Sequence, residues 1–309
     1  MNKALICIKP PGLGDANILL SNIHHISQEI SKPLTVLAQK TTGARAIFKH
    51  DPHVNDVIDL EKKDFFNIIN KIRSRKFDQC YIYSDSIRLY LIAKLSGIKK
   101  IYHYPFFSKK GKNFYKTAQK FTEGILQRKI NSASKIYWDN ESIEKAKKDY
   151  GIKADISSII CGVSASGPSK IYPVENYIKL FQEINSRFPS KFFLFGGKKD
   201  EVLIEKIMSS VPNCVSLSKL DLEKIIPIIA ACRFYIGNDT GPLHISANLN
   251  LKCLAIFCDS PPSAYGLWNP NIKIIVPSDK TIESTEHNTR GKNKISFDEV
   301  LEKSINLIN

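Results

Sequence analysis

The chain has 309 residues, of which 43% are hydrophobic and 24% are charged. These proportions are typical of a globular protein and exclude a disordered, collagen-like or fibrous chain. Lys and Arg number 45 against 30 Asp and Glu, and the resulting net charge of +15 favours anionic partners such as nucleic acid, acidic lipid or nucleotides. The longest apolar runs, such as 225–231, are too short to cross a bilayer, and the first eight residues are too short for a signal-peptide core.

The seven cysteines are odd in number and lack CxxC spacing. Five of them lie in or beside apolar runs, where cysteine behaves as a small hydrophobic residue. We therefore expect free thiols in a reducing cytoplasm.

In the first half of the chain, short apolar runs alternate with segments of helical period. Such alternation requires crossover helices over a parallel sheet, which predicts a doubly wound α/β domain. The expected strands are 4–8, 34–38, 56–60, 79–83 and 100–104, and the expected helices are 16–30, 44–48, 65–75 and 87–95.

Residues 105–155 are rich in lysine and poor in strand signals, and we interpret them as a helical hinge with helices over 112–130 and 141–150. The alternation then resumes. The expected strands are 156–160, 192–195, 215–217, 234–237 and 253–257, and the expected helices are 174–188, 201–210, 222–231, 242–250 and 297–308. This predicts an N-terminal domain over 1–152, a C-terminal domain over 153–294, and a last helix over 295–309 that packs back towards the N-terminal domain. Ligands of two such domains bind in a cleft outside the strand ends.

The first candidate site is the turn Lys9-Pro-Pro-Gly12-Leu-Gly14-Asp15 between a strand and a helix. Its glycines permit close backbone approach, and a carboxylate is favoured at a helix N-terminus. Asp15 is therefore either a helix cap or a catalytic base. A dinucleotide fingerprint would need glycine at position 17, which is Asn17.

Two further strand-to-helix loops have the composition of anion sites. Residues 162–173 combine small residues and hydroxyls, including Ser166, with Lys170, which suits a phosphate cradle but also occurs as plain structure. Gly196 and Gly197 follow the next strand and are only weak evidence for a ligand site.

The most informative segment is Gly237-Asn-Asp239-Thr240-Gly241-Pro242-Leu-His244. A buried strand precedes it, and Pro242 suits the first position of a helix. Backbone amides and the Thr240 hydroxyl would face an anion, and Asp239 would accept from a sugar hydroxyl. A strand, turn and capped helix without a ligand is the alternative.

Other candidates lack context. His24 and His25 have no cysteine or carboxylate partner at metal spacing in the sequence. The lysine-rich stretches carry no nucleic-acid-binding motif, so we expect no nucleic-acid partner.

Six segments, in this order and spacing, resemble family 9 glycosyltransferases, the ADP-heptose:lipopolysaccharide heptosyltransferases. They are 9–20 (KPPGLGDANILL), 77–102, 169–173 (SKIYP), 195–200, 236–250 (IGNDTGPLHISANLN) and 295–300. The resemblance implies a GT-B fold, with two Rossmann-like domains that face a central cleft. It also implies inverting transfer from an ADP-sugar to a lipopolysaccharide core or other surface glycan.

The resemblance implies a role for each matching residue. Asp15 would be the general base, and Lys9, Gly12 and Gly14 would lie at the acceptor. The donor would be bound by Ser166, Lys170, Gly196, Gly197, Asp239, Thr240, Gly241, Pro242 and His244. No metal or other cofactor would be required, because lysine and helix amides can offset the leaving charge. The protein would be a monomer on the cytoplasmic face of the inner membrane, in contact with an anionic glycolipid.

The chain departs from the family pattern near the donor. Val163-Ser164 stands where the family usually has Pro-Gly, Tyr172 stands where it usually has Trp, and Cys258 stands where it usually has glycine. Two other functions stay open: a different nucleotide-sugar enzyme such as an epimerase, and a protein that binds nucleotide sugars without catalysis.

Overall fold

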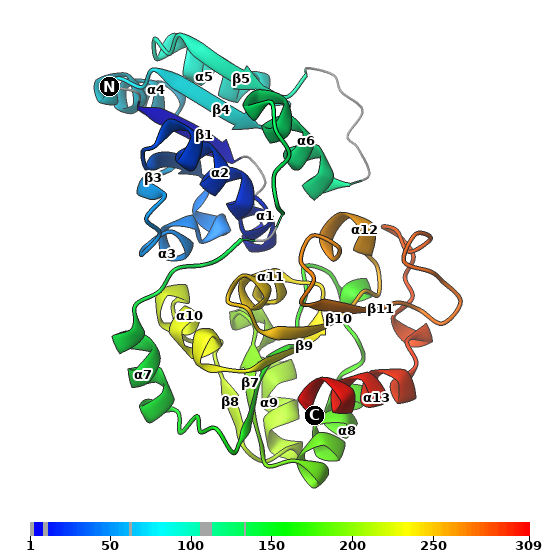
Figure 1. The fold of residues 1–309 in the computed structure, drawn as a ribbon. Coiled ribbons are helices and arrows are strands. Elements are labelled where there is room, and N and C mark those ends of the chain that lie inside the picture. Colours follow the sequence, from blue (N-terminus) through cyan, green and yellow to red (C-terminus); the bar gives the residue numbers. More distant parts are fainter. Residues whose placement is uncertain (1–2, 9–11, 62–63, 106–112, 133) are drawn as a thin grey trace. The chain divides into compact units, whose positions relative to one another are not determined.

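The computed structural model describes residues 3–8, 12–61, 64–105, 113–132 and 134–309. It divides into two compact units, Met1–Tyr137 and Trp138–Asn309. Each unit contains a parallel sheet with helices on both faces (Figure 1). The division falls earlier than the boundary expected after residue 152, because α7 (Asn140–Asp149) packs against α10 (Leu222–Ala231) of the second unit.

The first unit has a five-stranded sheet in the order β3-β2-β1-β4-β5. Its strands are β1 (Ala4–Ile8), β2 (Leu34–Ala38), β3 (Val54–Asp59), β4 (Gln79–Tyr83) and β5 (Lys100–His103). Its helices are α1 (Leu13–Ile18), α2 (Leu20–Ile30), α3 (Ala44–Ile47), α4 (Phe65–Arg75), α5 (Ile87–Leu95) and α6 (Phe114–Leu126).

Helices cover both faces of this sheet. The apolar sides of α4 and α5 pack with Leu5 and Ile82 of the sheet in one buried cluster. On the opposite face, the Tyr83 hydroxyl hydrogen-bonds the Thr122 hydroxyl of α6 (2.7 Å), which donates to Asn22 of α2 (2.7 Å). Both faces of the central strands are therefore buried, as their unbroken apolar sequences require.

The helix expected over 16–30 is two helices. The first begins at Leu13, and the break falls at Leu19, which caps both. Leu19 is fully buried within an apolar run, so the break between α1 and α2 cannot be recognised in the hydrophobic pattern of the sequence.

The second unit has a six-stranded sheet in the order β11-β10-β9-β6-β7-β8. Its strands are β6 (Ser157–Gly162), β7 (Ser190–Phe195), β8 (Cys214–Ser216), β9 (Phe234–Asn238), β10 (Lys252–Ile256) and β11 (Ile272–Ile275). With α7 and α10, its helices are α8 (Val174–Arg187), α9 (Glu201–Ser210), α11 (Gly241–Asn248), α12 (Pro262–Tyr265) and α13 (Phe297–Ile308). The short elements β11 and α12 were not expected from the sequence.

The main core of the second unit lies between the sheet and the helices α8, α9 and α13. Tyr177, Phe181 and Ile184 on α8 are fully buried, as their helical spacing predicts. The last helix, α13, packs against α8 and the strands β9 and β10 of its own unit. Ser296 caps this helix by accepting from the Glu299 amide at 3.3 Å, as expected.

Candidate active site

In the first unit, the turn after β1 places Asp15 in the first turn of α1. Gly12 is the N-cap of that helix, so Asp15 is its third residue and not its cap. A side chain on Gly12 would put its Cβ 2.6 Å from Oδ2 of Asp15. The Asp15 carboxylate thus lies against the backbone of Gly12. Lys9 lies outside the described residues.

The position of this turn within the sheet fits a ligand site. In the strand order, β1 pairs with β2 on one side and with β4 on the other, so the direction of winding reverses between β1 and β4. Open α/β sheets bind ligands at the carboxyl ends of the strands at such a switch point. Gly12, Gly14 and Asp15 all follow the carboxyl end of β1.

The second unit has its own switch point, between β6 and β9. The Ser-rich loop follows β6, and the turn Asp239–Thr240–Gly241 follows β9, so the topology brings both predicted donor loops to one edge. Beneath them Gly162 and Gly237 pair across the two strands. A Cβ on Gly237 would lie 2.5 Å from the Gly162 amide nitrogen, so the two backbones touch without side chains between them.

Asn238, which is fully buried, connects the two loops. Its Oδ1 accepts from the Tyr172 amide at 2.9 Å, and its Nδ2 donates to the Ser164 carbonyl at 3.5 Å. The Tyr235 hydroxyl donates to the carbonyl of Asn238 itself at 2.6 Å. One side chain therefore fixes the Ser-rich loop relative to the end of β9.

Asp239 is the centre of a buried polar network. Its Oδ2 accepts from the Ser260 hydroxyl at 2.6 Å, and its Oδ1 lies 3.5 Å from Nε2 of His244. The Trp268 indole donates to Nδ1 of His244 at 3.2 Å. Because Nδ1 is an acceptor, the proton of a neutral His244 is on Nε2 and points at Asp239.

The surroundings keep the Asp239 carboxyl ionised. Burial alone raises its pKa, but the hydrogen bond and charge of His244, the hydrogen bond from Ser260 and the charge of Lys170 outweigh it, and the pKa lies below its ordinary value. Asp239 is thus held as an oriented anion, which suits it to accept a hydrogen bond from a sugar hydroxyl.

Lys170 lies near two carboxylates. Besides Asp239, its charge acts on Asp259, which follows β10 and accepts from the Arg290 amide at 2.8 Å. Burial raises the pKa of Asp259, but a hydrogen bond from Ser169, the Arg290 amide and the Lys170 charge lower it below the usual range. Sequence reasoning missed Asp259 and Ser260, although their place after a strand at the same edge was an available signal.

The other predicted donor residues have different local surroundings in the structure. Thr240 is the N-cap of α11 without a side-chain cap bond, and Gly241 and Pro242 form its first turn. Gly197 donates its amide to Asp200 at 2.8 Å, and a Cβ on Gly196 would meet Ile204 at 2.9 Å. Local packing thus accounts for Gly196, whereas a Cβ on Gly197 would make only an ordinary contact with Asp200 at 3.8 Å.

Ser166 is exposed in its loop, beside the Ala165 carbonyl that accepts from Nζ of Lys199 at 3.4 Å. That contact joins the loops after β6 and β7. All the predicted donor residues therefore lie on the loops, or in the first turns of the helix, that follow three adjacent strands, β7, β6 and β9.

Residues 67–294 match the model of glycosyltransferase family 9 (heptosyltransferase). The chain belongs to this family.

Two curated relatives carry the same family name. Lipopolysaccharide heptosyltransferase 1 of Campylobacter coli is 32% identical over 136 residues, which are 42% of this chain and 40% of that protein. Lipopolysaccharide heptosyltransferase 2 of Escherichia coli K12 is 20% identical over 293 residues, which are 84% of this chain and 83% of that protein. The match to the C. coli relative thus spans less than half of its length.

The structure of E. coli ADP-heptose lipopolysaccharide heptosyltransferase II is similar over 99% of this chain and 98% of that one, with a TM-score of 0.79 and 18% identity. The expected GT-B fold of two Rossmann-like domains is confirmed.

The described part of this family 9 chain holds neither a candidate metal cluster nor a membrane-spanning helix. It contains no group of three or more His, Cys, Asp or Glu side chains placed to hold a metal ion. It also contains no helix that is long and apolar enough to cross a membrane.

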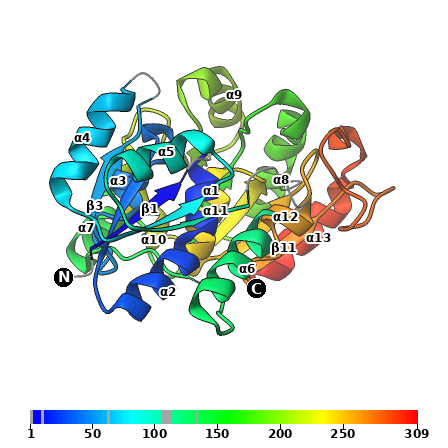
Figure 2. The same cartoon turned by 90° about the horizontal axis from the view of Figure 1, so that it is seen from above.

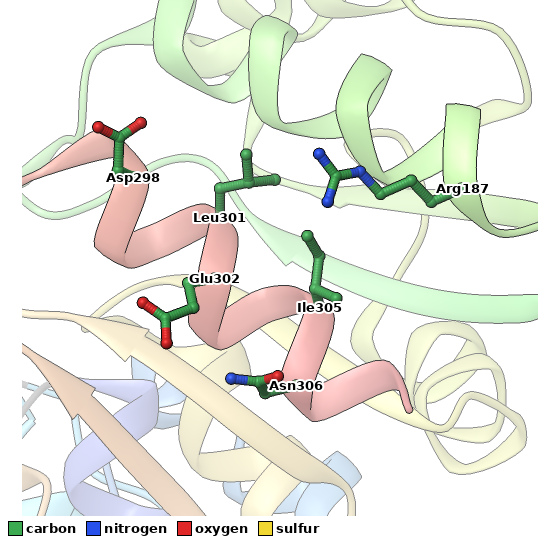
Figure 3. Close-up of a pocket in the computed structure, with 6 residues that line it drawn as sticks. All are labelled: Arg187, Asp298, Leu301, Glu302, Ile305 and Asn306. Carbon is green, nitrogen blue, oxygen red and sulfur yellow. The ribbon is translucent and has the colours of Figure 1, made fainter.

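A pocket of about 340 Å³ lies along α13 and the end of α8 (Figure 3). Its lining includes none of the predicted site residues and consists of Arg187, Asp298, Leu301, Glu302, Ile305 and Asn306.

Proposed function

We propose that this family 9 protein is an inverting glycosyltransferase that moves a heptose or a related sugar from an ADP-sugar to a lipopolysaccharide core or other surface glycan. The observation that carries the proposal is the arrangement of the loops at the carboxyl ends of β6 and β9 in the second unit. There the charge of Lys170 acts on Asp239, and Asn238 ties the two loops together across the switch point. A cation beside helix amides at a sheet switch point suits the diphosphate of a nucleotide sugar.

In this proposal Asp15 accepts the proton of the acceptor hydroxyl as its oxygen attacks the anomeric carbon. The bond from that carbon to the diphosphate oxygen breaks on the opposite face, and ADP leaves with the bonding electrons. Lys170 and the amides of the Thr240–Gly241 turn would stabilise the leaving charge. Asp239, oriented by His244 and Ser260, would accept from a donor hydroxyl.

The proposal also covers the metal dependence, oligomeric state and location of the protein. Because cationic and amide groups would offset the charge of the leaving diphosphate, we expect turnover to persist in EDTA. We propose that the protein works as a monomer on the cytoplasmic face of the inner membrane, where an anionic glycolipid acceptor would be available. The net charge of +15 supports this location.

The test is Asp15→Asn with ADP-heptose and a lipopolysaccharide-core acceptor, measured as ADP release. We expect kcat to fall by about 100-fold or more, since general base catalysis contributes this much. ADP affinity should stay within about twofold. Asp64→Asn is the matched control, because Asp64 also lies at the start of a helix of the first unit, as the N-cap of α4, and makes no side-chain cap bond.

Other results separate the alternative functions. Interconversion of the donor sugar without an acceptor would identify an epimerase. Saturable donor binding without ADP release from any donor and acceptor pair would identify a binding protein. Full turnover by Asp15→Asn would remove Asp15 as the base.

A further inference from the structure

Four large apolar side chains are exposed together on two neighbouring helices of the first unit. Phe66 on α4 is 76% exposed, and the exposures of Ile87, Leu91 and Leu95 on α5 are 52%, 42% and 48%. Only three other large apolar side chains are exposed in the described part of the chain. Since α4 and α5 have only 11 and 9 residues, this concentration is local.

The geometry of the helices places these side chains on one face. Ile87, Leu91 and Leu95 recur every four residues, so they form one stripe along α5, while Leu89 and Ile92 of the same helix are buried against the sheet. Helix α4 packs beside α5, and the two lie next to each other in Figures 1 and 2.

Contacts between the two helices align their ends. The Arg88 guanidinium at the start of α5 lies 6.0 Å from the ring centre of Phe65 at the start of α4. At the other end, Arg73 of α4 donates to the Leu95 carbonyl at 2.7 Å. The stripe of α5 and Phe66 therefore belong to one surface, which we call the α4–α5 face and define by Phe66, Arg73, Ile87, Leu91, Lys94 and Leu95.

The helices that form this face lie in a positively charged segment of the chain, in which Arg75 pairs with Asp56 of β3. Segment 64–100, which contains both helices, has eight Lys and Arg residues against three Asp and no Glu. Lys94 is exposed and lies one position before Leu95, so a cation adjoins the apolar stripe itself. Apolar side chains among cations form the pattern by which a helix surface binds an anionic bilayer, with the apolar groups inserted and the cations at the headgroups.

Other occupants fit less well. A second copy of the chain would bring Arg73 and Lys94 close to the same cations of its partner, and like charges at an interface oppose association. Nucleic acid would satisfy the cations but leave Phe66 and Leu91 without apolar contacts.

We propose that the α4–α5 face is a docking surface for a bilayer that contains anionic lipid. This gives a specific location to the membrane contact of the proposed function. Its test uses neither donor nor acceptor, so it can fail or succeed independently of sugar transfer.

The experiment is co-sedimentation of the full chain with vesicles of phosphatidylethanolamine and phosphatidylglycerol (about 70:30), and with vesicles of phosphatidylcholine alone. We expect binding to the anionic vesicles that weakens as salt is raised. The double variant Leu91→Ser/Leu95→Ser should weaken it by at least about tenfold. Lys94→Glu should weaken it by about fivefold or more.

The controls come from the second unit. Val202→Ser/Met208→Ser removes two exposed apolar side chains from α9, and Lys224→Glu reverses an exposed charge on α10. Both controls should keep the wild-type affinity for the anionic vesicles. Circular dichroism melting should show that every variant is folded.

Three results would overturn the proposal. The first is equal loss of binding in the α9 and α4–α5 variants. The second is binding to phosphatidylcholine as strong as to the anionic vesicles. The third is a concentration-dependent dimer in light scattering that Leu91→Ser/Leu95→Ser abolishes, because that would identify the face as a contact between copies.

Discussion

The hydrogen bond from Trp268 to His244 offers a sharp test of the network that orients Asp239. In Trp268→Phe the ring stays apolar, but Nδ1 of His244 loses its donor at 3.2 Å. His244 is 3% exposed and Trp268 is 1% exposed, so bulk water does not reach the vacated position. We expect a cost of about 1–3 kcal/mol for the unsatisfied acceptor and about 1 kcal/mol more for the smaller ring.

A double-mutant cycle separates these two contributions. Urea unfolding is followed by circular dichroism for the wild type, Trp268→Phe, His244→Leu and the double variant. Once His244 is leucine there is no acceptor to satisfy, so Trp268→Phe should cost about 1–2 kcal/mol less in that background. In the single variant Trp268→Phe, we also expect calorimetry to show about tenfold weaker ADP binding, because His244 no longer holds Asp239 in one orientation.

Additive effects within about 0.5 kcal/mol would refute this reasoning, because they would show that the indole does not act through His244. The other tryptophan of the sequence is the matched control. Trp138→Phe should show no coupling to His244.

Three further predictions concern separate parts of the molecule. Gly237→Ala should destabilise the protein by about 3 kcal/mol in urea unfolding, because its Cβ would meet backbone atoms of β6. The control Gly167→Ala should be nearly neutral, because a Cβ there has no atom within 4 Å. Equal effects of the two variants would contradict the close contact between the strands. Lys170→Met should weaken ADP binding by about 10- to 100-fold in calorimetry, and an unchanged affinity would remove it from the donor site. Burial, followed by the charge of His24, lowers the pKa of His53 below 6.5, so its contribution to stability is present above about pH 6.5 and is lost as the pH falls below that value. Thermal melts should show that His53→Asn reduces the loss of stability between pH 7 and 5 and that His50→Asn, at an exposed histidine, does not.

Much of the fold was predictable from periodicity, and the reason lies in where the strands are. The strands 4–8, 34–38 and 79–83 and the helices 65–75 and 87–95 have the bounds expected for them. Each central strand is buried on both faces and therefore reads as an unbroken apolar run. By contrast, β11 (Ile272–Ile275) was missed, because it is an edge strand whose apolar run is interrupted by the exposed Lys273.

The site was predictable only where its residues are contiguous. The turn after β9 carries its own composition signal in Asp239, Thr240 and Gly241. Ser260 and Trp268 complete the network of Asp239, but they are 21 and 29 positions away along the chain and meet it only through the order of the strands. His24 shows the same limit: the structure places its Nε2 2.8 Å from Asp51, a partner that spacing did not reveal.

The buried amide of Asn238 has a consequence for engineering a change of donor. Its two hydrogen bonds reach the two ends of the Ser-rich loop, at Ser164 and Tyr172, where the sequence departs from the family pattern, and both contact only backbone atoms. Val163 and Tyr172 are fully buried in the core of the second unit, so a library at these positions should keep to side chains of similar volume. Asn238 itself should stay constant in any such library, because a change there would release both ends of the loop at once.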